Sequence, residues 1–188
     1  MNFKDCCLNA RRAVAIDLPL WEMRGNKKLA GKTMTSRFDV LTIGNAIVDI
    51  IANSDDAFLA NENIIKGAMN LIDADRAEHL YSVMGPAIET SGGSAGNTAA
   101  GIASLGGKAA YFGKVSDDHL GGIFTHDIRA VGVDYQTKPL KGEPPTARSM
   151  FFVTPDGERS MNTYLGLSEF LSPDDIDQDL MGEAEWIF

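Results

Sequence analysis

Cysteine is scarce in this 188-residue chain, in which Cys6 and Cys7 are adjacent and are the only two. Neighbouring cysteines near one end of a chain supply neither a disulfide framework nor the ligand spacing of a metal site. Long apolar runs are lacking as well, and no stretch approaches the roughly 18 apolar residues of a membrane span. The composition therefore predicts a cytoplasmic protein in a reducing compartment, without a membrane partner.

Positive charge is in deficit, with 17 Lys and Arg against 26 Asp and Glu and a net charge of −9. This balance argues against a nucleic-acid partner, although backbone amides could still bind one small anion. Basic residues gather in the first 36 or so residues, which lack the unbroken apolar core of a secretory signal. We expect residues 1–36 to be a poorly ordered extension, or the residues before Met34 to lie upstream of the true start, with a transit-type leader as the alternative. Residues 37–188 are expected to form the folded part.

Common nucleotide-binding loops are also missing. The stretch from Gly25 to Gly31-Lys32-Thr33 has five residues between its glycines, where a P-loop has four, and no strand precedes it. The spacing G-x-G-x-x-G is absent around Gly92 and Gly93, which counts against a dinucleotide-dependent oxidoreductase. His79, His119 and His126 are scattered without ligand spacing, so we expect no metal site in the chain.

Strand and helix patterns alternate along the middle of the chain. Apolar, β-branched stretches predict strands, and capped periodic stretches predict helices. The strands are expected at 39–44, 66–72 and 109–115, and the helices at 73–84, 97–105 and 118–131. Such alternation favours an α/β layered fold, with a parallel sheet and crossover helices.

A β-hairpin is expected next, with strands at 147–154 and 158–164 joined by Pro155-Asp156-Gly157. Ser172-Pro173 has the residue types that open a helix, and residues 185–188 begin another apolar strand. Two interpretations of the hairpin segment Met150-Phe151-Phe152 remain open: core packing, or a lid over a ligand.

Two stretches indicate a binding site. Ser91-Gly92-Gly93-Ser94-Ala95-Gly96-Asn97 describes a tight loop that enters a helix, where free N–H groups suit an oxygen-rich ligand. Asp49 lies within an apolar run, where an unpaired carboxylate would be costly. Each stretch alone has a structural explanation, in which Asp49 caps a neighbouring loop and Asn97 starts a helix. Together they favour a ligand site.

In their order and spacing these elements resemble the PfkB (ribokinase-like) family of carbohydrate and nucleoside kinases. The resemblance covers about Phe38 to Phe188 and is nearest to bacterial adenosine-kinase-like members. One position departs from the family pattern, since Ser116 stands where glycine is usual. The matching motifs are Gly44-Asn45-Ala46-Ile47-Val48-Asp49, Gly92-Gly93-Ser94-Ala95-Gly96-Asn97, Leu105-Gly106-Gly107 and Gly113-Lys114-Val115-Ser116-Asp117-Asp118.

The resemblance implies a ribokinase-like fold, with a mainly parallel sheet flanked by helices and a small β lid. It implies ATP-dependent phosphorylation of a sugar or nucleoside hydroxyl, with ATP and Mg²⁺ as cofactors, in a monomer or homodimer. Asp49 would accept hydrogen bonds from two sugar hydroxyls. The other residues that would hold the same ring are Asn45, Gly92, Gly93, Ser94 and Asn97.

Family members carry their catalytic base in a later Gly-Ala-Gly-Asp element, and no Gly-x-Gly-Asp occurs in these 188 residues. The resemblance therefore implies that the C-terminal half is absent, together with the catalytic residue and most nucleotide contacts. We expect a substrate-binding half that is inactive alone. The alternative is a non-catalytic module that binds a ribosyl ligand.

Overall fold

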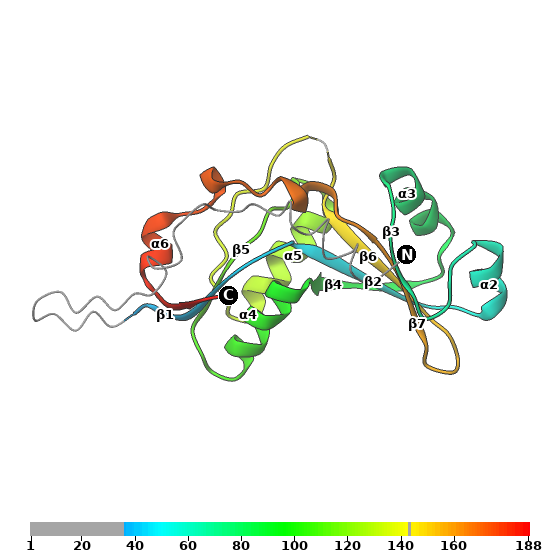
Figure 1. The fold of residues 1–188 in the computed structure, drawn as a ribbon, viewed down its shortest axis with the longest axis horizontal. Helices are drawn as coiled ribbons and strands as arrows, with labels where there is room; N and C mark the ends of the chain where they lie inside the picture. The colour runs from blue at the N-terminus through cyan, green and yellow to red at the C-terminus, as the bar shows by residue number, and fades with distance from the viewer. Residues whose placement is uncertain (1–35, 143) are drawn as a thin grey trace, which may run out of the picture.

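The computed structural model describes residues 36–142 and 144–188. Two β-sheets lie along the long axis of this part, and one stretch of chain belongs to both (Figure 1). Strand β1 (Phe38–Ile43) lies in the first sheet and β2 (Ile47–Asn53) in the second. Only three residues, 44–46, separate them, so the junction of the two sheets is a short segment of backbone.

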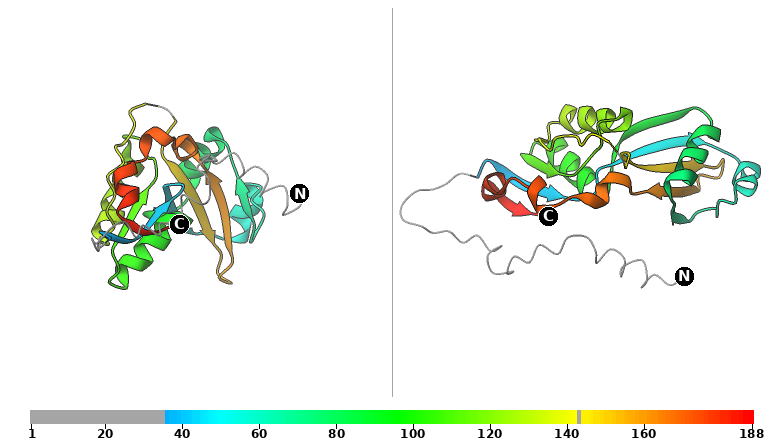
Figure 2. Two further views of the ribbon diagram at one scale, coloured as in Figure 1. Left: turned by 60° about the vertical axis from the view of Figure 1, so that its left-hand side comes forward. Right: turned by 90° about the horizontal axis from the view of Figure 1, so that it is seen from above.

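The first sheet has the strand order β5-β1-β8 and is wholly parallel. Its outer strands are β5 (Ala109–Phe112) and β8 (Ala184–Ile187). Helices α4 (Ser94–Ser104) and α5 (His119–Ala130) lie on one face, and α6 (Gln178–Gly182) lies on the other (Figure 2). Every residue of β5 is buried, as expected for a parallel strand covered on both faces.

The second sheet is mixed and has the order β3-β7-β6-β2-β4. Strand β2 pairs in parallel with β6 (Ala147–Val153) and antiparallel with β4 (Ala87–Gly92). Strands β6 and β7 (Arg159–Tyr164) form the expected hairpin, and β3 (Met69–Leu71) is the far edge.

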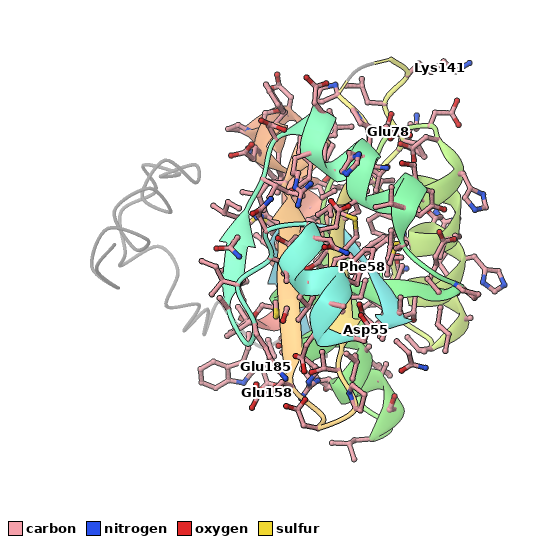
Figure 3. The ribbon with its side chains drawn as sticks, turned by 90° about the vertical axis from the view of Figure 1, so that its right-hand side faces the viewer. Asp55, Phe58, Glu78, Lys141, Glu158 and Glu185 are labelled. Atoms are coloured by element: carbon pink, nitrogen blue, oxygen red, sulfur yellow. The ribbon has the colours of Figure 1, made fainter. Side chains whose placement is uncertain are left out.

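Two helices cover only one face of this second sheet. They are α2 (Asp56–Asn61) and α3 (Ala74–Val83), and Figure 3 shows them in front of the strands, with Phe58 on α2 and Glu78 on α3. Val48, Ile50, Met150 and Phe152 are fully buried on the covered face. The opposite face, with Ile51 and Ile88 exposed, has no helix over it in the described part of the chain.

The predicted fold class is confirmed: a parallel sheet is flanked by helices, and the small β part is the five-stranded sheet. The hairpin, α3 and α5 lie close to their predicted positions. Strands β2 and β4 and helix α2 were not predicted. The apolar run of β2 was interpreted only as the surroundings of Asp49, and β4 and α2 mix apolar and polar types without a clear period. Residues 1–35, which make up nearly all of the expected extension, lie outside the described residues.

Two predicted helices were wrong in detail. Helix α4 begins at Ser94 rather than at Asn97, because Gly93 already acts as its N-cap with a φ of +83°. The helix expected after Ser172 is a single 3₁₀ turn, η3 (Pro173–Asp175), preceded by another, η2 (Gly166–Phe170). The extended backbone at Ile176 separates η3 from α6. None of the helices within residues 36–142 and 144–188 is long and apolar enough to cross a membrane.

Candidate functional site at the junction of the two sheets

The short segment between β1 and β2 is packed tightly against the start of α4. Tyr111 Oη donates a hydrogen bond to the carbonyl of Gly44 at 2.8 Å, and the buried Thr42 Oγ1 donates to the carbonyl of Ala95 at 3.1 Å. A Cβ at Gly44 would lie 2.7 Å from the Cβ of Ala95, so the approach requires glycine. These contacts fix where β2 begins relative to α4.

Asp49 is half-buried on β2, on the face opposite the covered residues Val48 and Ile50. No other group within residues 36–142 and 144–188 makes a hydrogen bond or ion pair with its carboxylate. Burial alone raises the pKa of Asp49 from 3.8 to about 6. A half-buried carboxylate without a partner is costly, and it is a strong acceptor for a ligand's hydroxyl groups.

Gly92 lies directly against this carboxylate. Strand pairing places Gly92 opposite Ile47, and a Cβ added at Gly92 would overlap the carboxyl group of Asp49. Any larger residue would displace the acid or the strand. Because Gly92 has no side chain, the Asp49 carboxylate can lie against the end of β4.

Gly93 meets a different requirement. Its φ of +83° is a conformation that residues with a Cβ rarely adopt, and a Cβ there would lie 2.5 Å from the carbonyl oxygen of Asn45. Gly93 directly follows β4 and is the N-cap of α4. Gly92 and Gly93 are thus needed for separate reasons, close approach to a carboxylate in one case and a left-handed turn in the other.

Ser94 and Asn97 lie in the first turn of α4, and both are exposed, as is Asn45. No side chain caps the N-terminus of this helix within the described residues. Uncapped N–H groups at a helix start favour an oxygen-rich ligand. The structure brings Asn45, Asp49, Gly92 and Gly93 into one cluster, and Ser94 and Asn97 follow on the next turn of chain.

Further residues share the face of the second sheet that carries Asp49, here called the Asp49 face. Register places Ser149 of β6 beside Asp49, and the Ser149 hydroxyl is 2.7 Å from that of Thr163 on β7. Ile51 and Phe151 are neighbours on the same face. Ser149 and Thr163 were not predicted from the sequence, because strand alternation indicates a face of the sheet but only the register indicates which residue lies beside Asp49.

The three residues Met150-Phe151-Phe152, for which core packing and a lid were both open, lie on two different faces of the sheet. Met150 and Phe152 are 0% and 1% exposed and pack in the core, where the Phe152 ring lies 5.2 Å from that of Phe58. Phe151 is half-buried on the Asp49 face. Core packing therefore accounts for two of the three residues, and only Phe151 is placed to meet a ligand beside Asp49.

The side chains that could bind a metal ion are those of aspartate, glutamate, histidine and cysteine. Within residues 36–142 and 144–188 no three of them are grouped to hold a metal ion. His79 lies 2.8 Å from Glu62, His119 3.4 Å from Glu89, and His126 3.0 Å from Asp127. Each histidine in the chain is therefore paired with a single carboxylate.

Comparison with known proteins gives a consistent result. The model of the pfkB family carbohydrate kinases matches residues 60–187. Among curated relatives, an ATP-dependent ribose-1-phosphate kinase of Halopiger xanaduensis is 31% identical over 99 residues, which cover 53% of this chain and 33% of that protein. A probable fructokinase-3 of Arabidopsis thaliana is 32% identical over 100 residues, 52% of this chain and 29% of the relative.

Solved structures are more similar. The adenosine kinase of Sinorhizobium meliloti is 71% identical with a TM-score of 0.75, and a probable sugar kinase protein of Rhizobium etli CFN 42 is 68% identical with the same TM-score. In both comparisons 81% of this chain matches 46% of the other. The chain thus spans about a third of these curated relatives and just under half of these structures.

Proposed function

Because the chain belongs to the pfkB family of carbohydrate kinases, we propose that it forms the acceptor-binding part of an ATP-dependent kinase. The acceptor would be a hydroxyl group of a sugar or nucleoside. Two similar proteins named above, an adenosine kinase and a ribose-1-phosphate kinase, support this class of substrate.

The observation that carries the proposal is the half-buried carboxylate of Asp49, which has no hydrogen-bond or ion-pair partner in the described part of the chain. Two adjacent ribose hydroxyls would supply the donors that the carboxylate lacks, and hydrogen bonds to a charged acceptor are about twice as strong as neutral ones. Asp49 precedes the residues matched by the family model, so its role rests on this geometry and on the motif around it.

The remaining site residues would hold the same ring. Gly92 and Gly93 would let it approach the backbone closely, and Asn45, Ser94 and Asn97 would offer exposed polar groups at the start of α4. Ile51 and Phe151 add apolar surface beside Asp49. A ribose with an attached base matches this pairing of polar and apolar surface, so we favour adenosine and then ribose-like sugars.

The cofactors of the proposal are ATP and Mg²⁺. ATP supplies the phosphoryl group, and a metal ion would neutralise charge on its phosphates. This part of the proposal rests on the family, and no residue within 36–142 and 144–188 is assigned to either group. The second candidate is a ribosyl-binding module without catalysis, which would use the same half-buried carboxylate of Asp49.

Calorimetric titration of the purified chain with adenosine, ribose and fructose tests acceptor binding. We expect Asp49→Asn to weaken binding roughly ten- to a hundredfold, the cost of losing bonds to a charged acceptor. Asp174→Asn, which alters an exposed carboxylate on η3, is the matched control and should leave binding unchanged. Equal affinities for the original chain and Asp49→Asn would refute the role of Asp49.

A transfer assay separates the two candidate functions. With ATP, Mg²⁺ and adenosine, we expect the 188-residue chain to show no useful phosphate transfer, because we expect no catalytic base among these residues. A positioned base alone raises the rate of such a reaction roughly 10²–10⁴-fold. A longer protein that includes a Gly-x-Gly-Asp element should transfer phosphate. Ordinary kinase turnover by the purified 188 residues would mean that a catalytic residue lies within them.

A further inference from the structure

Strand β4 lies at the edge of the second sheet, and one of its backbone N–H groups donates a hydrogen bond to a side chain of helix α5. The N–H of Ser91 donates a hydrogen bond to Oδ2 of Asp127 on α5 at 3.1 Å. Ser91 immediately precedes Gly92 and Gly93. Asp127 is therefore bound to the backbone at the position from which the glycine turn begins.

Helix α5 also binds the backbone next to β6, the strand on the other side of β2. Asp118, the N-cap of α5, accepts hydrogen bonds from Thr146 N at 2.8 Å and from Thr146 Oγ1 at 2.7 Å. Thr146 directly precedes β6. Ile47 of β2 pairs with Gly92 on one side and with Ala147 on the other. The start of β2, two residues before Asp49, thus lies between two strands that α5 holds by carboxylates.

Packing of α5 does not depend on Asp127. Phe124 and Ile128, on the same helix, are 0% and 1% exposed and anchor it in the core. The Asp127 side chain is 29% exposed, and its other oxygen faces His126 Nδ1 at 3.0 Å. What Asp127 adds to this packing is a fixed acceptor for Ser91.

We propose that Asp127 is a positioning residue for the acceptor site. By holding the N–H of Ser91, it fixes the Gly92–Gly93 turn against Asp49 and so sets the affinity for the acceptor. The effect on affinity rests on the function proposed above, whereas the effect on the turn does not.

Three variants of the 188-residue chain test this inference. Asp127→Ala removes the acceptor, Asp127→Asn keeps a carbonyl oxygen that can accept from Ser91, and His126→Ala alters only the exposed side of the pair. Amide hydrogen exchange of residues 91–93, followed by NMR, reports on the turn. Calorimetric titration with adenosine and ribose reports on the acceptor site.

For Asp127→Ala we expect exchange at Ser91 and Gly93 to accelerate about tenfold or more, and acceptor affinity to fall about tenfold, as for loss of one charge-assisted bond. Asp127→Asn should keep the exchange rates and the acceptor affinity close to those of the original chain, and His126→Ala should change neither quantity. Unchanged exchange in Asp127→Ala would overturn the inference. Faster exchange with unchanged affinity would also overturn it, because Asp127 would then be structural only.

A third measurement applies if the original chain binds no acceptor, which would refute the proposed function. The carboxyl ¹³C shift of Asp49 can be titrated without ligand. If the turn loosens in Asp127→Ala, water reaches the carboxylate and the apparent pKa of Asp49 should fall from about 6 toward its ordinary value. An unchanged titration of Asp49 would then overturn the inference about Asp127 independently.

Discussion

At the scale of single residues, the surroundings of Asp49 oppose its ionisation. Burial raises the pKa of this carboxyl from 3.8 to about 6, so the folded protein binds the proton more tightly than the unfolded chain does. The resulting stabilisation is fully present below about pH 4 and is lost as the pH rises through about 6. At neutral pH the ionised acid is therefore a cost to folding that a ligand could offset.

Asp49→Asn should accordingly stabilise the free protein at pH 7.5 while it weakens acceptor binding. An amide has nearly the shape of the neutral acid and carries no charge to desolvate. Because Asp49 is only half-buried, we expect a gain of about 1–2 kcal/mol in the free energy of unfolding. Urea titrations at pH 4 and 7.5 measure it. A gain that is equal at both pH values would show that charge is not its cause.

Gly93 offers a second prediction at this scale, with a matched control in the hairpin turn. Gly93 and Gly157 have φ values of +83° and +85°, but a Cβ at Gly157 would meet nothing within 4 Å, whereas one at Gly93 would crowd the carbonyl of Asn45. Gly157→Ala should cost about 1 kcal/mol of stability from backbone strain alone. Gly93→Ala should cost roughly 2–4 kcal/mol, since steric overlap adds to the strain.

Thermal and urea unfolding of the two alanine variants provide the measurement. Equal losses would mean that the Asn45 carbonyl moves aside without penalty, and the close approach of the two segments would then not define the site.

At the scale of elements, one lysine joins the end of β5 to the segment that carries η2 and η3. Lys114 Nζ lies 2.7 Å from Oδ2 of Asp175 and 3.3 Å from the carbonyl of Phe170. Burial of the Asp175 carboxyl opposes its ionisation, but the ammonium of Lys114 and bonds from Ser172 outweigh burial, so the pKa of Asp175 falls below 3.8. This stabilisation is present above about pH 4 and is lost as the pH falls through the lowered value.

Lys114→Met should destabilise the protein by about 1–3 kcal/mol at pH 7. It removes the ammonium from the Asp175 carboxylate, which keeps only its bonds from Ser172, and it removes the Lys114 donor from the Phe170 carbonyl. The loss should shrink at acid pH, below the lowered pKa of Asp175, where this carboxyl is neutral. Lys108→Met, which changes an exposed lysine that precedes β5, is the control. Chemical unfolding at both pH values measures the effect. A loss no larger than that of the control would show that the link is a surface pair without energetic weight.

At the scale of the whole molecule, the first sheet has an open edge. Strand β8 pairs only with β1 within residues 36–142 and 144–188. Trp186, Ile187 and Phe188 are 68%, 38% and 63% exposed, so apolar side chains accompany free backbone groups along this edge. Exposed apolar edge strands provide a template for pairing with another chain.

The isolated chain should therefore self-associate as its concentration rises, and Trp186→Lys should reduce the association. Leu105→Lys is the control, since Leu105 is 91% exposed at the end of α4 and belongs to no strand. Light scattering coupled to size-exclusion chromatography measures the mass. Association that Leu105→Lys reduces as much as Trp186→Lys does would indicate general apolar contact and not pairing at β8.

Prediction from sequence succeeded at this scale where the signals are local. Asp73 and Asp118 were expected to open helices, and both accept hydrogen bonds from the first turns of α3 and α5. Gly106 and Gly132 directly follow the predicted helices at 97–105 and 118–131, and both have the positive φ values common at helix ends. Prediction failed for β2 and β4, because β4 is half-exposed and polar and becomes a strand only through pairing with β2.

Residue type and spacing by themselves determined the α/β class and the hairpin, since caps and turns act over a few neighbouring positions. Together with the family resemblance they predicted the six residues named for the site. Tertiary structure alone decided three contacts. Gly92 lies against the Asp49 carboxylate, Ser149 is the neighbour of Asp49 on β6, and Asp127 accepts a hydrogen bond from Ser91. These contacts join residues 36 to 100 positions apart through strand register and helix packing. Register depends on the whole sheet, so no local pattern specifies it.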